Sequence, residues 1–226
     1  MRALAILVVL AGVARADAGA QLDYEASTYY RTAQDHMAAP GALLLVGARL
    51  HGFAGAGAVG YHGGVDAAVG ATLNGDGFAY DVVLFPYGVG IGLGGTSHVE
   101  LGVGVGANGA TSSLDDAVSL PAEIRFELGS SIRLLGRVRT TKLFASKSRQ
   151  IGVYSDELEA TFAVRLAHAS GEGYRSSGNF IGAGYRELMG ERFFGIIIGF
   201  AQEIGTPYAS YHERARHDDG EGPDID

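Results

Sequence analysis

Hydrophobic and polar residues alternate with a period of two along most of the chain. In residues 122–128 the charged side chains of Glu123, Arg125 and Glu127 alternate with apolar ones, and in residues 132–139 arginines alternate with aliphatic residues. Side chains two positions apart lie on the same face of a β-strand, so this pattern predicts strands with one apolar face and one charged face.

Short clusters of Gly, Asn, Asp and Ser interrupt the alternation and predict hairpin turns between the strands. Nine strands are predicted at residues 42–54, 59–73, 77–92, 98–108, 120–129, 131–145, 157–169, 178–188 and 192–203. Because bacterial outer-membrane barrels have an even number of strands, Asp23 to Arg31 is predicted as a tenth. Eight strands is the alternative. The longer connections, 109–119 and 146–156, are expected at the end of the barrel opposite the chain termini.

The glycines indicate which face lines the interior. Along residues 99–106 one face is aliphatic, whereas the other carries Glu100 followed by three glycines. Glycine weakens a strand but leaves room in a crowded lumen, and an arginine facing lipid near the midplane costs about 2 to 4 kcal/mol. We therefore predict an all-β fold, a closed up-and-down antiparallel transmembrane β-barrel with its charged face inward. A secreted, soluble lipocalin-like ligand-binding barrel, with the apolar face inward, is the alternative.

The charged residues of this inner face form a predicted lumen network. Its members are Glu100, Glu123, Arg125, Glu127, Arg133, Arg137, Arg139, Glu159 and Arg165. A turn at residues 129–131 would place Glu127 opposite Arg133 and Glu123 opposite Arg137, which are favourable cross-strand pairs. A plug of ion pairs is therefore expected in the lumen, with a functional pore or proton path as the alternative.

Pro86 marks a change of face within one predicted strand. The apolar positions carry even numbers from Phe78 to Leu84 and odd numbers from Tyr87 to Leu93. Since proline cannot donate a ladder hydrogen bond, this switch predicts a β-bulge at Pro86.

The N-terminal residues predict export. Arg2 is followed by an apolar stretch of residues 3–13 and by the small residues Ala14, Ala16 and Ala18 of two overlapping cleavage patterns. The stretch is too short for a membrane-spanning helix, so residues 1–18 are predicted to be a cleaved signal peptide. The barrel is then expected at residues 19–203, and the acidic tail at residues 204–226 is expected to be disordered.

Composition narrows the function classes. The chain of 226 residues has a formal net charge of −8 and contains no cysteine, which excludes a disulfide framework and a thiolate metal site. An acidic chain without a basic stripe argues against a nucleic-acid partner. The chain has only two lysines, Lys142 and Lys147, whereas soluble β-proteins usually carry lysine on exposed edges. The polar face is therefore not expected to be an open, water-exposed surface. No cofactor and no metal are predicted; loose cation binding by His212 and His217 in the tail is the weaker alternative to a solvated tail.

The chain resembles the small bacterial outer-membrane β-barrel proteins, the broad OmpA/OmpX-like superfamily. The resemblance covers residues 1–203 and rests on the signal peptide, the alternating strands and the hairpin turns. It implies a location in the outer membrane of a Gram-negative cell envelope, contact with outer-membrane lipid, insertion by the barrel assembly machinery and a monomeric state. It also implies a porin-like protein of structural, adhesive or narrow-conductance type.

A second resemblance concerns two residues, His168 and Ser170. The sequence His168-Ala169-Ser170 is similar to the His-x-Ser pair of outer-membrane lipid A deacylases, in which serine is the nucleophile, histidine the general base and a carboxylate orients the histidine. Glu172 and Glu187 are positional candidates for that carboxylate. A non-enzymatic barrel is expected, with a lipid A deacylase-like hydrolase as the alternative function.

Overall fold

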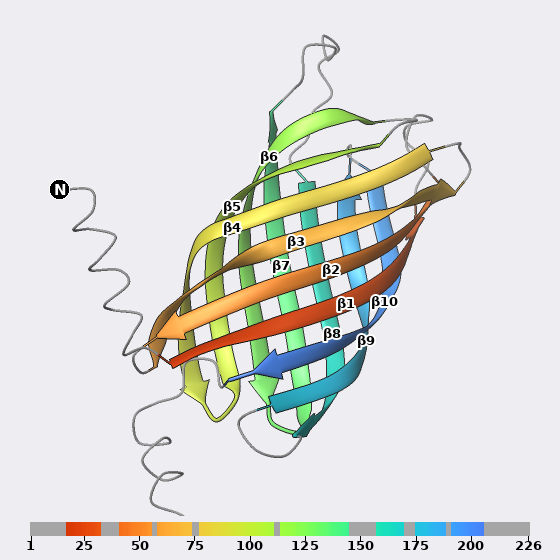
Figure 1. Ribbon diagram of the computed structural model, residues 1–226. Coiled ribbons are helices and arrows are strands. Elements are labelled where there is room, and N and C mark those ends of the chain that lie inside the picture. The colour runs from red at the N-terminus through yellow and green to blue at the C-terminus, as the bar shows by residue number, and fades with distance from the viewer. Residues whose placement is uncertain are drawn as a thin grey trace, which may run out of the picture.

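Ten antiparallel strands form a closed barrel (Figure 1). The computed structural model describes residues 17–32, 41–55, 58–73, 77–110, 114–144, 157–169, 175–188 and 191–205. The strands are β1 (Asp17–Arg31), β2 (Ala42–Gly55), β3 (Val59–Leu73), β4 (Gly77–Gly94), β5 (Ser97–Ala110), β6 (Leu114–Gly129), β7 (Ile132–Phe144), β8 (Glu157–Ala169), β9 (Arg175–Leu188) and β10 (Glu191–Ile204). Each strand pairs with its neighbours in sequence, and β1 also pairs with β10, which closes the sheet. The predicted fold class and the count of ten strands are confirmed.

The longest connections between strands lie at one end of the barrel. At the termini end, where β1 begins and β10 ends, β4 is joined to β5 and β6 to β7 by two residues each. The predicted connection 146–156 lies at the opposite, far end. The predicted long connection 109–119 is wrong, because Asn108 still pairs with Ala117 and only residues 111–113 separate β5 from β6. Backbone pairing thus continues through a segment whose Gly and Asp content indicates a turn.

The limits of the barrel differ slightly from those predicted. β1 begins at Asp17, two residues before the expected start of the mature chain, and β10 ends at Ile204. Cleavage after Ala16 would leave β1 complete, whereas cleavage after Ala18 would remove its first two residues. The apolar N-terminal stretch and residues 206–226 lie outside the described residues, so the signal peptide and the disordered tail remain predictions. No helix in the described part of the chain is long and apolar enough to cross a membrane.

The turn between β6 and β7 lies one residue further along the chain than predicted. Gly129 pairs with Arg133, so Glu127 lies opposite Leu135 and Glu123 opposite Arg139. Gly129 has a φ of 112°, and a Cβ there would lie 2.2 Å from a backbone oxygen of the turn. Glycine is therefore required at this corner, which fixes the register. The predicted pairing of Glu123 with Arg137 is wrong, but the residues keep their predicted faces because the register changes by an even number.

The bulge predicted at Pro86 is confirmed. The pairing of β4 with β5 shifts between Leu84 and Tyr87, and the pairing of β3 with β4 shifts between His62 and Gly64. The extra residue reverses the faces, so Leu84 before it and residues 89, 91 and 93 after it all lie exposed on the outer surface.

The outer face of the barrel is apolar and the inner face is charged. Aliphatic residues such as Val103, Ile132 and Ile181 are about 60% exposed on the outside, whereas Glu127 and Arg165 are fully buried inside. The lipocalin-like alternative, which requires the apolar face inward, is therefore wrong.

One patch of the lumen wall is nevertheless apolar. Phe180 of β9 packs with Ile197 and Ala201 of β10 and with Ala163 of β8. A Cβ at Gly199 would lie 2.2 Å from the Phe180 ring, so this glycine makes room for the aromatic side chain. The same three strands also contribute buried charged side chains to the lumen, among them Arg165, Arg186 and Glu203.

Candidate functional site

All nine side chains of the predicted lumen network lie on the inner face, where each forms at least one ion pair. They come from β5 to β8 only. The structure adds partners that the sequence analysis did not single out, namely Asp23, Glu25, Arg49, Asp66, Asp81, Glu157, Arg186 and Glu203. The same period-two rule, applied to β1 to β4 and to β8 to β10, would have placed these residues on the inner face.

The part of the network nearest the termini end is built around Glu127. Its Oε1 accepts hydrogen bonds from Nη1 of Arg133 at 2.6 Å and from Nη1 of Arg165 at 3.2 Å. Arg133 Nη1 also lies 2.6 Å from Oε2 of Glu203 on β10. The Ser176 hydroxyl accepts from both arginines, at 3.2 and 3.1 Å. Five strands, β6 to β10, thus share one cluster of charges.

The middle of the network crosses the lumen. Arg49 of β2 donates to Glu123 of β6, and Arg139 of β7 donates from Nε to the other Glu123 oxygen at 3.0 Å. Arg139 also donates to Asp66 of β3. The pairs of Arg49 with Glu123 and of Arg139 with Asp66 join strands that are not neighbours in the sheet, so they connect opposite walls of the barrel.

Arg125 and Arg137 lie directly opposite each other on β6 and β7, and each is paired with carboxylates from other strands. Arg137 donates to Glu159 of β8, and its Nη1 lies 3.4 Å from Oδ2 of Asp66. Arg125 Nη2 lies 3.4 Å from Oδ2 of Asp23 on β1. Like charges in directly opposed positions are destabilising on their own, so these carboxylates are what permits two adjacent arginines.

The network continues toward the far end. Arg186 of β9 lies 3.4 Å from Asp81 of β4 and 3.8 Å from Glu157 of β8, measured between Nη2 and the carboxylate oxygens. Arg139 Nη1 approaches the same Asp81 oxygen at 3.5 Å. Ion pairs therefore occur along much of the length of the lumen.

These ion pairs can join the walls of the barrel and close its interior to solutes. A cavity of about 60 Å³ remains in the middle of the lumen, lined by residues that include Arg49, Arg125 and Arg137. One water needs about 10 to 15 Å³ on this measure, so the cavity has room for only a few waters.

His168 and Glu187, the two described residues of the deacylase resemblance, are not brought together. His168 lies exposed on the outer face and pairs with Ser177, whereas Glu187 pairs with Leu158 at the other end of β8. Ten residues of strand separate the two positions, about 33 Å. Glu187 therefore cannot orient His168, and it instead accepts a hydrogen bond from Tyr185 at 3.2 Å. Ser170 and Glu172 lie outside the described residues.

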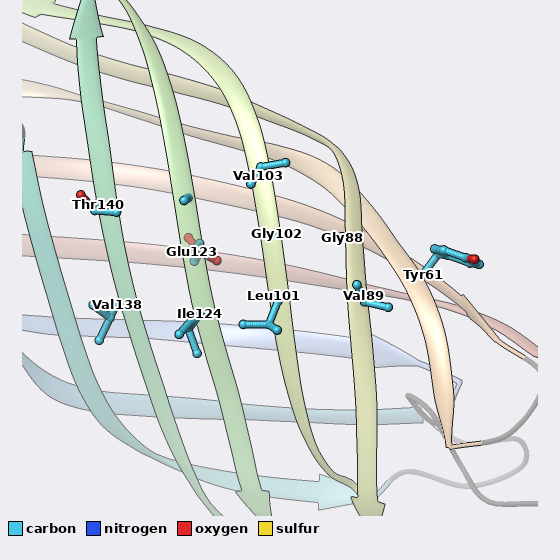
Figure 2. A pocket seen from close by; sticks show the side chains of 11 residues that line it. Tyr61, Gly88, Val89, Leu101, Gly102, Val103, Glu123, Ile124, Val138 and Thr140 are labelled. Atoms are coloured by element: carbon cyan, nitrogen blue, oxygen red, sulfur yellow. The ribbon is translucent and has the colours of Figure 1, made fainter.

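A hollow on the outer surface spans β3 to β7. Figure 2 shows aliphatic side chains of the hollow, such as Leu101 and Ile124, on the near side of the wall, while Glu123 lies behind its strand. The lining is almost wholly apolar. It belongs to the apolar outer face rather than to the charged lumen.

Comparison with protein-family models gives no match, and no curated protein is significantly similar to the chain. Among solved structures, the crystal structure of Pseudomonas aeruginosa OccK5 (OpdH) is 9% identical, with 84% of this chain and 98% of that chain covered and a TM-score of 0.19. That of Pseudomonas aeruginosa OpdQ is 10% identical, with 85% and 98% covered and a TM-score of 0.19. Superposition this poor says nothing of function, which is therefore inferred from the barrel's own geometry.

Proposed function

We propose that the chain is a structural outer-membrane β-barrel whose lumen is closed to ions by the charged network. The observation that carries this proposal is the set of ion pairs between strands that are not neighbours, such as Arg49 with Glu123 and Arg133 with Glu203. Such pairs occupy the space through which a solute would pass. A barrel of this strand number has an interior that side chains can fill.

The outer surface supports a membrane location. Exposed apolar side chains occur on all ten strands, with Tyr24 on β1 and Ile198 on β10 at the closing seam. The strands have 13 to 18 residues, and about 9 to 11 residues suffice to cross a bilayer when tilted. A closed barrel leaves no unpaired strand edge in lipid.

Fractionation and electrophoresis test the location. The full-length protein is expressed in a Gram-negative host, and the outer-membrane fraction is run on a gel with and without boiling. We expect the protein in that fraction, with faster migration of the unboiled form because the barrel stays folded. Recovery as a soluble protein without detergent would contradict the proposal.

Planar bilayer recording tests the closed lumen. We expect no steady ionic current from the inserted wild-type barrel, with boiled protein as the control for non-specific leakage. Regular conductance steps from protein that shows the folded gel shift would favour the narrow-conductance alternative and overturn the plug.

A further inference from the structure

We infer that the lumen holds a divalent transition-metal site, of the class that binds Zn²⁺, formed by His51 of β2, His62 of β3 and Glu100 of β5. One potential ligand atom from each of the three residues lies within 4.8 Å of the other two. All three side chains are buried, with exposed fractions of 2%, 8% and 2%. Two imidazoles and one carboxylate form a donor set that zinc uses in proteins.

The hydrogen bonding of His62 favours this assignment. Its Nε2 lies 2.9 Å from the backbone oxygen of Leu101, a contact that requires Nε2 to carry the proton and donate. The lone pair is then on Nδ1, which is buried and has no hydrogen-bond partner among the described residues. Metal-binding histidines typically donate their second ring nitrogen to a carbonyl or carboxylate in this way.

His51 provides an independent observation. Neither of its ring nitrogens has a hydrogen-bond partner in the described part of the chain, although the side chain is almost completely buried. Its Nε2 lies 3.6 Å from Oε2 of Glu100, which is too far for a hydrogen bond. Two ligands on a tetrahedral zinc lie about 3.4 Å apart, given metal–ligand distances near 2.1 Å. The separation fits two ligands of one ion better than a direct bond.

A glycine on the strand between the ligands makes the cluster possible. β4 separates β3 from β5, and Gly88 is the direct neighbour of His62 in the ladder. A Cβ at Gly88 would lie 2.1 Å from Nε2 of His62. The absence of a side chain there lets the imidazole lie across β4 toward Glu100.

Two further cationic or titratable side chains, those of His98 and Arg125, lie near the Glu100 carboxylate. His98 Nε2 lies 3.8 Å from Oε1 of Glu100, and His98 Nδ1 lies 3.1 Å from the backbone oxygen of Thr96. Arg125 Nη1 lies 3.9 Å from Oε2 of Glu100. The ion would join β2, β3 and β5 close to the bulge at Pro86, where the ladders on both sides of β4 are irregular.

Metal retention by the folded barrel in detergent tests the inference. Protein stripped with a chelator is loaded with Zn²⁺ or Co²⁺ and dialysed; bound metal is counted by elemental analysis, and cobalt coordination is followed by its visible absorption. We expect about one ion per chain in the wild type. His51→Gln, His62→Gln and Glu100→Gln should each weaken binding at least about tenfold, and Gly88→Ala should do the same with every ligand still present.

Two controls test whether binding is specific to the proposed lumen site. Gly52→Ala adds a methyl group beside His51 with no heavy atom nearer than 3.8 Å, so it should leave binding unchanged. A variant with His36, His168, His212 and His217 all changed to Gln keeps only the three lumen histidines and should still bind one ion.

The gel shift of unboiled protein verifies folding of each variant. If a ligand variant does not fold, the wild type and the four-histidine variant are compared, because binding that persists in both does not require the four histidines that were changed. A folded wild type that retains no metal would overturn the site. So would binding that survives His51→Gln or that disappears in the four-histidine variant.

Discussion

At the scale of single residues, the inner face depends on which guanidinium meets which carboxylate. Glu123 is held by Arg49 and Arg139, while Arg137 is held by Glu159 and Asp66. Removing one member of a buried pair costs more than the pair itself contributes, because the partner keeps its charge without compensation. Double substitutions can therefore distinguish true partners from merely nearby charges.

Arg137→Leu is expected to lower the free energy of unfolding by about 3 to 5 kcal/mol, the usual cost of breaking a buried pair. Adding Glu159→Gln should recover part of this loss, because it removes the charge left behind. Adding Glu123→Gln should recover none, because Glu123 retains Arg49 and Arg139. Unfolding in urea is followed by circular dichroism, since the chain has no tryptophan. Recovery by Glu123→Gln alone would show that the sequence-based pairing was right and the observed register wrong.

At the scale of single strands, each strand must present an apolar face to the outside of the barrel and its other face to the lumen. β5 shows this most clearly, with Leu101, Val103 and Val105 exposed outside and Glu100 buried inside. In β4 the outward-facing apolar residues change from even to odd positions, which is possible only because the bulge at Pro86 inserts one extra residue.

Val103→Arg is expected to block insertion of the barrel. Val103 lies near the middle of β5 and is 59% exposed on the outer face, so an arginine there costs about 2 to 4 kcal/mol in lipid. Insertion into lipid vesicles is measured by the gel shift, with Val103→Leu as the matched control that should insert normally. If the arginine variant inserts as well as the leucine variant, the outer face does not contact lipid.

Deletion of Pro86 should disrupt the barrel, whereas Pro86→Ala should preserve it. The deletion removes the extra residue of the bulge and turns Val89 and Ile91 inward and Gly88 and Gly90 outward, against the observed faces. The substitution keeps the residue count and therefore the register. Loss of the gel shift in the deletion but not in the substitution is the expected result; equal behaviour of the two variants would show that the bulge does not set the faces.

At the scale of the whole molecule, closure depends on the pairing of β1 with β10. Their ladder runs from Ala20 with Ile204 to Arg31 with Phe193, with no register shift. Every strand therefore has two neighbours, and no edge remains open to lipid or to another chain.

Truncation after Gly205 is expected to leave the barrel intact, because β10 ends at Ile204 and its ladder with β1 is complete. The truncated protein should refold in detergent with an unchanged gel shift and unfolding midpoint. Truncation after Leu188, which removes β10 and opens the sheet, is the control that should abolish the shift. Failure of the first truncation would show that the barrel requires residues 206–226.

Local alternation and turn residues were enough to predict the ten strands, their faces and the bulge, although the connection between β5 and β6 is shorter than predicted. The sequence by itself also determined that the charged residues of β5 to β8 share one face. The ion-pair partners could be read only from the folded barrel, since Arg49 and Glu123 lie 74 positions apart on strands that do not pair. The corner at Gly129 set the register of β6 and β7 through a backbone angle that the sequence pattern does not specify. No sequence motif indicated the cluster of His51, His62 and Glu100 either. These residues lie on three different strands and come together only in the folded sheet.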